Sequence, residues 1–183
     1  MSEKPYDFSI QLIGLNNSGK TTILHVLKKT LQNSIIGPTL GSQQEIISYS
    51  KSKKPIVIYD CSGEGRHRTQ WSNFYSEVDA IMFVIDSSDI IRFPIVKKHL
   101  RELVVDERIV QNKIPIMIIC NKEDLPEAVD KETIKEHLNL KEMKKGKGLQ
   151  LRTKGLSAFQ GAERLEDAMN WIYDTIQKNR VDL

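Results

Sequence analysis

The sequence has little of several features that would place it in a specialised class of protein. It has only two cysteines among its 183 residues, too few for the disulfide framework of a small secreted protein. We therefore expect a reducing compartment, the cytoplasm. No apolar run approaches the roughly 18 residues that a membrane-spanning helix needs. The net charge of +3 is mild, whereas nucleic-acid-binding domains carry clustered basic residues, so we expect no nucleic-acid partner.

The ends of the chain also lack familiar processing signals. The first residues, MSEKPYDF, have no signal-peptide pattern,. Ser2 stands where N-myristoylation requires glycine, and the last residues, KNRVDL, include no cysteine for prenylation,. We accordingly expect no lipid anchor. The basic segment 141–154 is interpreted as solvated surface, with attraction to an anionic membrane as the alternative,.

What is present is an alternation of short apolar segments and longer amphipathic ones. The apolar segments are rich in Ile and Val, which predicts strands buried on both faces, at 8–14, 55–60, 80–86 and 114–120,. Helical patterns occupy 20–31, 91–110 and 164–179,. Such alternation predicts an α/β fold with a mostly parallel sheet covered on both faces. Residues 43–50, followed by KSKK and the strand at 55–60, predict a hairpin and one antiparallel edge strand,. With no repeat and no linker, we expect one domain over 1–183 and a monomer.

The last helical segment allows a prediction of which of its residues are buried. Five apolar residues of this segment recur at helical spacing and would share one buried face: Leu165, Ala168, Met169, Ile172 and Ile176,.

The segment GLNNSGKTT, Gly14 to Thr22, matches the P-loop pattern G-x-x-x-x-G-K-[ST],. It follows a predicted strand and opens a predicted helix, as the motif requires. Glycines let backbone N–H groups surround phosphate oxygens, and the helix N-terminus adds its positive dipole end. The predicted phosphate-binding residues are Asn17, Ser18, Gly19, Lys20, Thr21 and Thr22. Lys20 would place its charge on the β- and γ-phosphates, which also makes it a predicted catalytic residue, and the Thr21 hydroxyl would bind Mg²⁺.

A second motif indicates which nucleotide base the site would recognise. The strand at 114–120 is followed by Asn121-Lys122-Glu123-Asp124, at the edge where ligands bind in open α/β sheets. The Asp124 carboxylate can accept hydrogen bonds from N1–H and N2–H₂ of guanine, a donor pair that adenine lacks. Lys122 can cover the face of the base and Asn121 can hold the loop and contact N7. We therefore predict guanine nucleotides, GTP and GDP, as ligands.

Three further positions complete the predicted site. Asp60 ends a strand where a carboxylate would hold Mg²⁺, and Thr39 in the preceding loop could close over the ion when a γ-phosphate is present,. Gly63 could offer its N–H to the γ-phosphate. Near the C-terminal end, Ser157 and Ala158 are predicted base contacts, with the Ala158 N–H facing guanine O6 and the register open by one residue.

In this order and spacing, GLNNSGKTT, PTLG, YDCSGEGRHRTQW, FVIDSSD and NKEDL resemble the Arf and Arf-like small GTPases. The resemblance runs from about Phe8 to Trp171. It implies the three-layer P-loop small GTPase fold, a six-stranded sheet with one antiparallel edge strand, and a register slip of the hairpin between nucleotide states. The arrangement SG-x-GR-x-R-x-x-W looks closest to the ciliary Arf-like branch linked to Bardet-Biedl syndrome. That branch implies recruitment of a coat-like complex, the BBSome, in the GTP state, and a ciliary or peripheral membrane location.

The sequence departs from the family pattern at three places. Arf proteins begin with an amphipathic, often myristoylated helix, and here a short polar segment precedes the first strand. Arf effectors contact an exposed aromatic trio, whose matching positions here are Ser42, Tyr59 and Phe74. Glu64 stands where the family has a catalytic glutamine that orients the attacking water. About 6 Å from a γ-phosphate charge, at an effective dielectric near 20, its carboxylate would be repelled by roughly 3 kcal/mol.

These observations predict a GTP-dependent switch with slow intrinsic hydrolysis. Its partners would be effectors in the GTP state, an exchange factor and a GAP, because the sequence offers no identifiable arginine finger in cis. Two alternatives stay open. One is a GTP-dependent scaffold that scarcely hydrolyses its nucleotide, which Glu64 favours. The other is a P-loop small-molecule kinase, against which the segment NKED argues.

Overall fold

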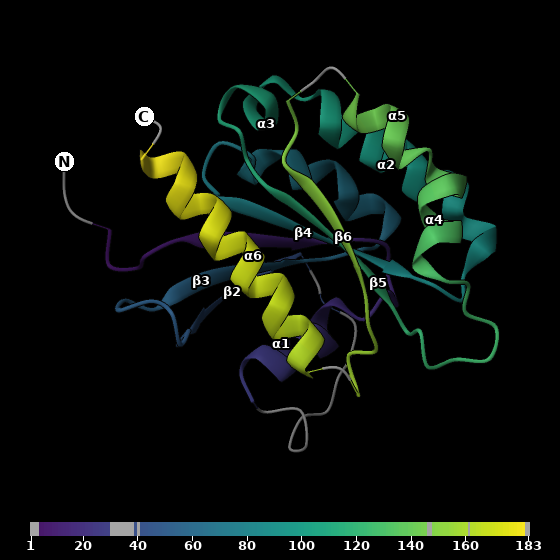
Figure 1. The fold of residues 1–183 in the computed structure, drawn as a ribbon, viewed down its shortest axis with the longest axis horizontal. Helices are drawn as coiled ribbons and strands as arrows, with labels where there is room; N and C mark the ends of the chain where they lie inside the picture. Colours follow the sequence, from purple (N-terminus) through teal and green to yellow (C-terminus); the bar gives the residue numbers. More distant parts are fainter. Residues whose placement is uncertain (1–3, 30–38, 40, 146–147, 161, 182–183) are drawn as a thin grey trace.

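The computed structural model describes residues 4–29, 39, 41–145, 148–160 and 162–181. Its strands form one six-stranded sheet in the order β2-β3-β1-β4-β5-β6. The strands are β1 (Ser9–Ile13), β2 (Ser42–Ile47), β3 (Ile56–Cys61), β4 (Ala80–Asp86), β5 (Ile116–Asn121) and β6 (Leu151–Gly155). The edge strand β2 pairs antiparallel with β3, and every other pair is parallel. The predicted α/β sheet with one antiparallel edge strand is confirmed (Figure 1).

Helices cover both faces of the sheet (Figure 1). The α-helices are α1 (Lys20–Leu27), α2 (Phe93–Val105), α3 (Glu107–Gln111), α4 (Lys131–Leu138), α5 (Leu140–Lys144) and α6 (Ala162–Val181). Two 3₁₀ helices, η2 (Gly65–Phe74) and η3 (Ile90–Arg92), follow β3 and β4. Helices α1 and α6 pack on one face of the sheet, while α2 to α5 pack on the other. The three-layer arrangement predicted from the sequence is therefore confirmed.

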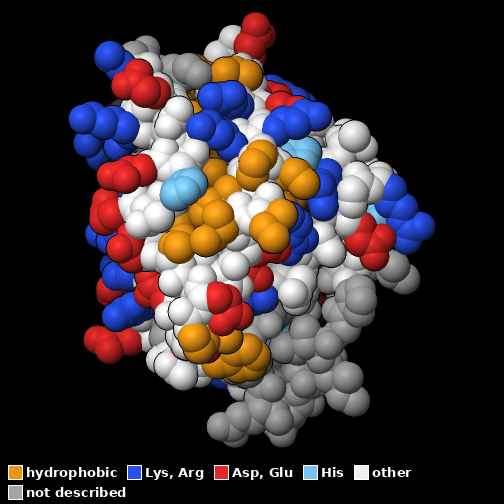
Figure 2. Space-filling view, turned by 90° about the vertical axis from the view of Figure 1, so that its right-hand side faces the viewer, with side chains coloured by type: hydrophobic (Ala, Val, Ile, Leu, Met, Phe, Trp, Pro, Cys, Tyr) orange, Lys and Arg blue, Asp and Glu red, His pale blue; other side chains and the backbone are white. Residues whose placement is uncertain are grey.

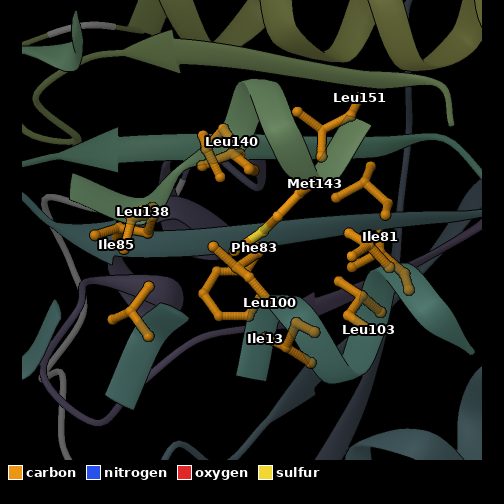
Figure 3. Close-up of a cluster of buried hydrophobic side chains, with 14 of the residues drawn as sticks. Ile13, Ile81, Phe83, Ile85, Leu100, Leu103, Leu138, Leu140, Met143 and Leu151 are labelled. Carbon is orange, nitrogen blue, oxygen red and sulfur yellow. The ribbon is translucent and has the colours of Figure 1, made fainter. Parts of the chain in front are cut away.

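The apolar strands serve two cores at once. Along β4, Ile81, Phe83 and Ile85 face the core shared with α2 to α5, whereas Met82 and Val84 face the core shared with α1 and α6. Side chains alternate between the faces of a strand, so a strand covered on both sides is apolar at nearly every position. Figure 3 shows part of the first core, in which Phe83 lies among side chains of the sheet and of the helices that cover this face.

The prediction for the last helix is confirmed in its details. The buried residues of α6 are Leu165, Ala168, Met169, Ile172 and Ile176, the same five that helical spacing selected. Burying a large aliphatic side chain contributes roughly 1.5–3 kcal/mol. This stripe therefore fixes α6 against the sheet.

The prediction of one continuous helix over 91–110 is wrong. The segment forms η3, α2 and α3, and the break between α2 and α3 lies at Asp106, whose backbone is extended (φ −66°, ψ 125°). The Asp106 side chain accepts a hydrogen bond from the Arg108 N–H at 3.0 Å and so caps the start of α3. Aspartate favours such caps because its oxygen satisfies an N–H that has no partner inside the helix. The apolar periodicity continued through the break and concealed it.

The basic segment 141–154 is more structured than the sequence interpretation suggested. Within its described part, Met143 is buried on α5, and Leu151 begins β6. Its lysines at 141, 144 and 145 are exposed, in agreement with a solvated basic surface. Over the described residues, no helix combines the length and the apolarity that crossing a membrane would take.

Candidate functional site

The phosphate loop lies between β1 and α1, as predicted. Gly19 occupies the position that precedes α1 and has φ 93°, a left-handed conformation that favours glycine,. A Cβ at Gly19 would lie 2.2 Å from Nδ2 of Asn121, which a side chain could not tolerate. Glycine therefore meets two demands here, the turn into the helix and the close approach of Asn121.

Lys20 is buried at the start of α1, with 5% of its surface exposed. Its ammonium donates to the carbonyl oxygens of Gly14 at 3.0 Å and Leu15 at 2.9 Å, so the loop wraps around its own lysine. Burial lowers the pKa of Lys20 to about 8, against the opposing effect of the Asp60 carboxylate. An anion next to the ammonium would favour the charged form and reverse this shift. The loop thus holds a desolvated cation beside the cavity described below.

Three predicted metal ligands from three separate segments meet beside this lysine. The Thr21 hydroxyl donates to Oδ2 of Asp60 at 2.9 Å, and the Thr39 hydroxyl donates to the same oxygen at 3.4 Å. The two threonine oxygens lie 3.0 Å apart. Thr39 is described by the structure, whereas its neighbour Pro38 lies outside the described residues.

The chemistry of this group suits a hard cation. Asp60 is fully buried, and its other oxygen, Oδ1, has no hydrogen-bond partner in the described part of the chain. Burial raises the pKa of Asp60, and a divalent cation would offset that cost because it favours the carboxylate. The described residues include no group of three or more His, Cys, Asp and Glu side chains that could hold a metal alone. A Mg²⁺ ion at Asp60 would therefore share hydroxyl, phosphate and water oxygens, which is how Mg²⁺ binds in nucleotide sites.

Gly63 lies directly against the phosphate loop. Its carbonyl accepts the Asn16 N–H at 3.1 Å, and a Cβ at Gly63 would come within 2.3 Å of that nitrogen. The preceding residue, Ser62, is held as well, because the buried Trp71 indole donates to the Ser62 carbonyl at 2.9 Å. Only glycine permits this approach, so the segment after β3 is seated on the loop at this point.

These segments enclose a cavity of about 350 Å³. It is lined by most of the predicted residues of the phosphate side together with Asn16 and Ser62. The lining residues are Asn16, Asn17, Gly19, Lys20, Thr21, Thr22, Thr39, Ser62, Gly63 and Glu64. Ser18 does not line it; its hydroxyl is buried and has no partner among the described residues. The residues predicted for the base do not line it either.

Glu64 lines the cavity but directs its carboxylate to an arginine. Its Oε2 accepts from Nε of the exposed Arg66 at 3.1 Å. Its backbone N–H approaches the Ser62 hydroxyl at 3.4 Å. An exposed ion pair of this kind is worth at most about 1 kcal/mol, so the carboxylate can leave Arg66 at little cost.

The base side of the predicted site is organised around Asn121, at the end of β5. Its Nδ2 donates to the Ser18 carbonyl in the phosphate loop at 2.9 Å, and its Oδ1 accepts the Ala158 N–H at 2.9 Å. Asn121 thereby ties the phosphate loop to the loop after β6. In this arrangement the Ala158 N–H is donated to Asn121, and its predicted contact with guanine O6 stays a prediction. The neighbouring Ser157 hydroxyl is buried without a partner in the described chain.

Lys122 and Asp124 lie on the turn that follows. Lys122 has a positive φ of 67° and its ammonium contacts the Asp86 carboxylate at 2.6 Å. Asp86 ends β4, the strand beside β5, and also accepts from the Ser88 N–H and hydroxyl. Asp124 is exposed, so its carboxylate is accessible to a ligand at the surface of the site.

Sequence reasoning assigned no role to Asp86, Asn16, Arg68 or Arg92, which the structure places in or beside the site. Asp86 could have been found from its position, because it ends a strand at the same edge as Asn121. Arg68 is part of the pattern SG-x-GR-x-R-x-x-W, but neither it nor Arg92 ends a strand, and both lie in 3₁₀ helices whose contacts depend on the tertiary fold.

A phosphate loop between a strand and a helix of a mostly parallel sheet, with converging Thr and Asp oxygens, defines a P-loop nucleotide-binding protein. The sequence matches the model of the ADP-ribosylation factor family over residues 1–176. The chain therefore belongs to the Arf family of small GTPases, which are guanine-nucleotide-binding switches and GTP hydrolases. This confirms the family resemblance.

Individual relatives share similar levels of sequence identity with this chain. The chain is 34% identical over 171 residues to ADP-ribosylation factor-like protein 5 of Caenorhabditis elegans, covering 92% of this chain and 90% of the relative. It is 34% identical over 175 residues to ADP-ribosylation factor-like protein 6 of Danio rerio, covering 95% and 91%. Among solved structures, the Arl6 BBS3 small GTPase of Trypanosoma brucei with bound GppNp superposes with a TM-score of 0.84 at 25% identity, covering 94% of this chain and 98% of that one. Equal identity to two Arf-like types leaves the branch within the family a prediction.

Proposed function

We propose that this chain binds GTP and Mg²⁺ in the cavity beside Lys20 and uses the terminal phosphate to hold Thr39 and Gly63 in place. The observation that carries this proposal is the convergence of Thr21, Thr39 and Asp60, which come from three different segments. When bound, Mg²⁺ supplies positive charge that stabilises the β- and γ-phosphates. Lys20 and the N–H groups at the start of α1 bind the phosphates.

The proposed switch depends on the contacts that hold the segments at Thr39 and Gly63. Within the described chain, the Thr39 hydroxyl hydrogen-bonds to Thr21 and Asp60. A γ-phosphate adds a partner for the Gly63 N–H and, together with the cation, holds the Thr39 hydroxyl in place, whereas GDP has no γ-phosphate. Loss of the γ-phosphate therefore releases both loops, and the surface that they form changes with them.

Guanine is proposed to bind between Lys122 and the loop at 157–158, with Asp124 as its specificity residue. The support is the network of Asn121, which positions both loops relative to the phosphates. An equilibrium competition of GTP and ATP against a fluorescent GDP analogue tests this proposal. We expect GTP to compete at least a hundredfold better than ATP, because adenine lacks the donor pair that Asp124 accepts. Equal competition would argue for a P-loop kinase or another ATP-binding function.

We further propose that intrinsic hydrolysis is slow. Glu64 lines the cavity, and a carboxylate there is repelled by the γ-phosphate and is a poor general base at neutral pH,. A GTP-dependent scaffold that scarcely hydrolyses its nucleotide is the second candidate, and Glu64 is the observation that favours it. A multiple-turnover phosphate-release assay, with and without extract as a source of GAP, separates the two. Turnover that appears only with extract supports a GAP-dependent GTPase.

Arf-family GTPases generally bind effectors, exchange factors and GAPs. The hairpin and η2 present the positions matching the aromatic trio: the rings of Tyr59 and Phe74 lie 5.3 Å apart, and Ser42 is exposed. A second candidate surface is the α4 side of the molecule, where hydrophobic side chains gather with Lys and Arg around them (Figure 2). Exposed hydrophobic residues of the described chain include Ile91 in η3 and Ile95 in the first turn of α2.

We propose that the effector is a coat-like complex of ciliary membrane trafficking, such as the BBSome. The support is the segment SGEGRHRTQW and the similarity to Arf-like protein 6. A cytoplasmic protein with peripheral membrane contact fits this role. The test is a pulldown from ciliated-cell extract with GTPγS-loaded and GDP-loaded protein. Recovery of coat subunits with GTPγS alone supports the branch, and recovery of none of them with either nucleotide contradicts it.

A further inference from the structure

Two arginines converge on one amide oxygen at the lip of the phosphate cavity. Oδ1 of Asn16 accepts from Nη1 of Arg92 at 2.9 Å and from Nη2 of Arg68 at 3.4 Å. Asn16 belongs to the phosphate loop after β1, Arg68 to η2 after β3, and Arg92 to η3 after β4. These three strands are neighbours in the sheet, in the order β3-β1-β4. One side chain thus joins the segments that leave three adjacent strands.

Arg68 makes a second and shorter contact. Its Nε donates to the Gly63 carbonyl at 2.7 Å, and the same carbonyl accepts the Asn16 N–H at 3.1 Å. The planar guanidinium therefore spans from the backbone of Gly63 to the side chain of Asn16. We name these contacts among Asn16, Gly63 and Arg68 the Arg68 latch. It fixes the peptide between Gly63 and Glu64 against the phosphate loop.

The charge of Arg68 is poorly compensated. Arg92 has the Asp89 carboxylate as a partner, and Glu64 pairs with Arg66. The hydrogen bonds of Arg68 within the described chain go to a carbonyl and an amide, and to no carboxylate. Burial and then the nearby charge of Arg92 lower the pKa of Arg68. Both arginine charges also lower the pKa of Lys20, although less than burial does.

We propose that Arg68 is a positioning residue for the triphosphate state: its latch holds Gly63 where the γ-phosphate can bind it, and its charge favours the more negative nucleotide. The inference rests on the proposed binding of GTP in this cavity. GTP binding requires the segment at Gly63 to be seated, whereas GDP makes no contact there. The free energy of the latch is therefore coupled to GTP affinity and not to GDP affinity.

The test measures dissociation constants of GTPγS and GDP, with Mg²⁺, for the wild type and for Arg68→Gln. The lost hydrogen bonds are donated by a charged group and are therefore stronger than neutral ones, so we expect GTPγS to bind roughly tenfold more weakly to Arg68→Gln, which corresponds to about 1.4 kcal/mol. GDP affinity should stay within about twofold. Arg101, an exposed arginine on α2, provides the matched control: Arg101→Gln should change neither constant.

Two further variants separate the latch from a general effect on folding. Arg68→Lys keeps the charge, but an ammonium cannot reach both Gly63 and Asn16, so we expect it to recover only part of the lost preference for GTPγS. Asn16→Ala removes the shared amide and should lower the same preference in a chain whose Arg68 is intact. A thermal melt of each nucleotide-free variant reports folding, and either variant alone suffices if the other does not fold.

The outcomes distinguish this inference from the function on which it rests. A wild type that binds both nucleotides, together with variants whose two constants move equally or not at all, overturns the latch and leaves the GTP switch intact. Full recovery by Arg68→Lys overturns the two-contact geometry. A wild type that binds neither nucleotide overturns both proposals.

Discussion

The side-chain oxygens of Thr21 and Thr39 lie 3.0 Å apart, although 18 positions separate them in the sequence. Thr21 is fixed in the first turn of α1, whereas Thr39 precedes the edge strand β2. Both hydroxyls donate to Oδ2 of Asp60. This contact holds the segment before β2 against the phosphate loop. The hydroxyls and the carboxylate that make the contact are the same groups that would bind a cation. This makes the position of Thr39 sensitive to what occupies the cavity.

Replacing Asp60 by asparagine should uncouple nucleotide retention from Mg²⁺. Asparagine keeps an oxygen that can accept from Thr21 but loses the charge that a divalent cation requires. In the wild type, chelation of Mg²⁺ should accelerate GDP release at least tenfold, which corresponds to about 1.4 kcal/mol. In Asp60→Asn, GDP release should be fast already, and chelation of Mg²⁺ should change its rate by less than about twofold. Stopped-flow fluorescence of a labelled GDP measures this, with the exposed Asp167→Asn as control. Equal responses to chelation in all three proteins would contradict the metal site.

Replacing Asp124 by alanine should remove the preference for guanine. Each hydrogen bond from the base to this carboxylate contributes about 1.5–3 kcal/mol, so GTP affinity should fall at least a hundredfold. ATP affinity should not fall, because adenine cannot donate this pair. The competition assay with GTP and ATP measures the ratio, and Glu127→Ala, an exposed carboxylate on the same loop, is the control. A GTP-to-ATP ratio unchanged in Asp124→Ala would place base recognition elsewhere.

Replacing Glu64 by glutamine should accelerate hydrolysis. The amide has nearly the same shape as the carboxylate but is not repelled by the γ-phosphate, and that repulsion amounts to roughly 3 kcal/mol. We expect the single-turnover rate of GTP cleavage to rise about tenfold or more, while GTP affinity rises only slightly. Glu107→Gln, on the exposed side of α3, should leave the rate unchanged. A rate that is the same in Glu64→Gln and wild type would remove Glu64 as the cause of slow turnover.

Nucleotide binding should take up a proton in alkaline solution. Burial lowers the pKa of Lys20 to about 8 in the free protein, and a phosphate beside the ammonium raises it again. At pH 9 most of the free protein carries neutral Lys20, so binding should take up about 0.9 proton, compared with about 0.1 at pH 7. Affinity should therefore weaken as the pH rises above 8. Calorimetry of GDP binding in buffers of different ionisation enthalpy measures the uptake, and equal uptake at both pH values would contradict a desolvated Lys20.

The sequence predicted those parts of the protein whose signals are local. The apolar runs identified the four strands β1, β3, β4 and β5, but not β6, which lies within the basic segment. The spacing of five residues identified the buried face of α6, and the P-loop pattern placed Lys20 and Thr21 at the start of a helix, where the structure has them. The break at Asp106 was missed because the apolar spacing of α2 continues into α3.

The contacts that organise the site were less accessible to sequence reasoning. The pair of Lys122 and Asp86 and the latch of Arg68 join segments that are 36 and 52 positions apart. Their partners include backbone carbonyls, which no residue pattern identifies. The sequence therefore indicates which residues carry the chemistry, while the structure shows which residues hold them in position.

The proposed switch depends most directly on a change at Gly63 between the two nucleotide states. Amide hydrogen exchange, followed by mass spectrometry over Ser62 to Arg68 with GDP and with GTPγS, measures it. We predict at least tenfold slower exchange with GTPγS, because the γ-phosphate and the Arg68 latch then hold this segment against the phosphate loop. Equal exchange with both nucleotides, in protein shown to bind each of them, would contradict the account.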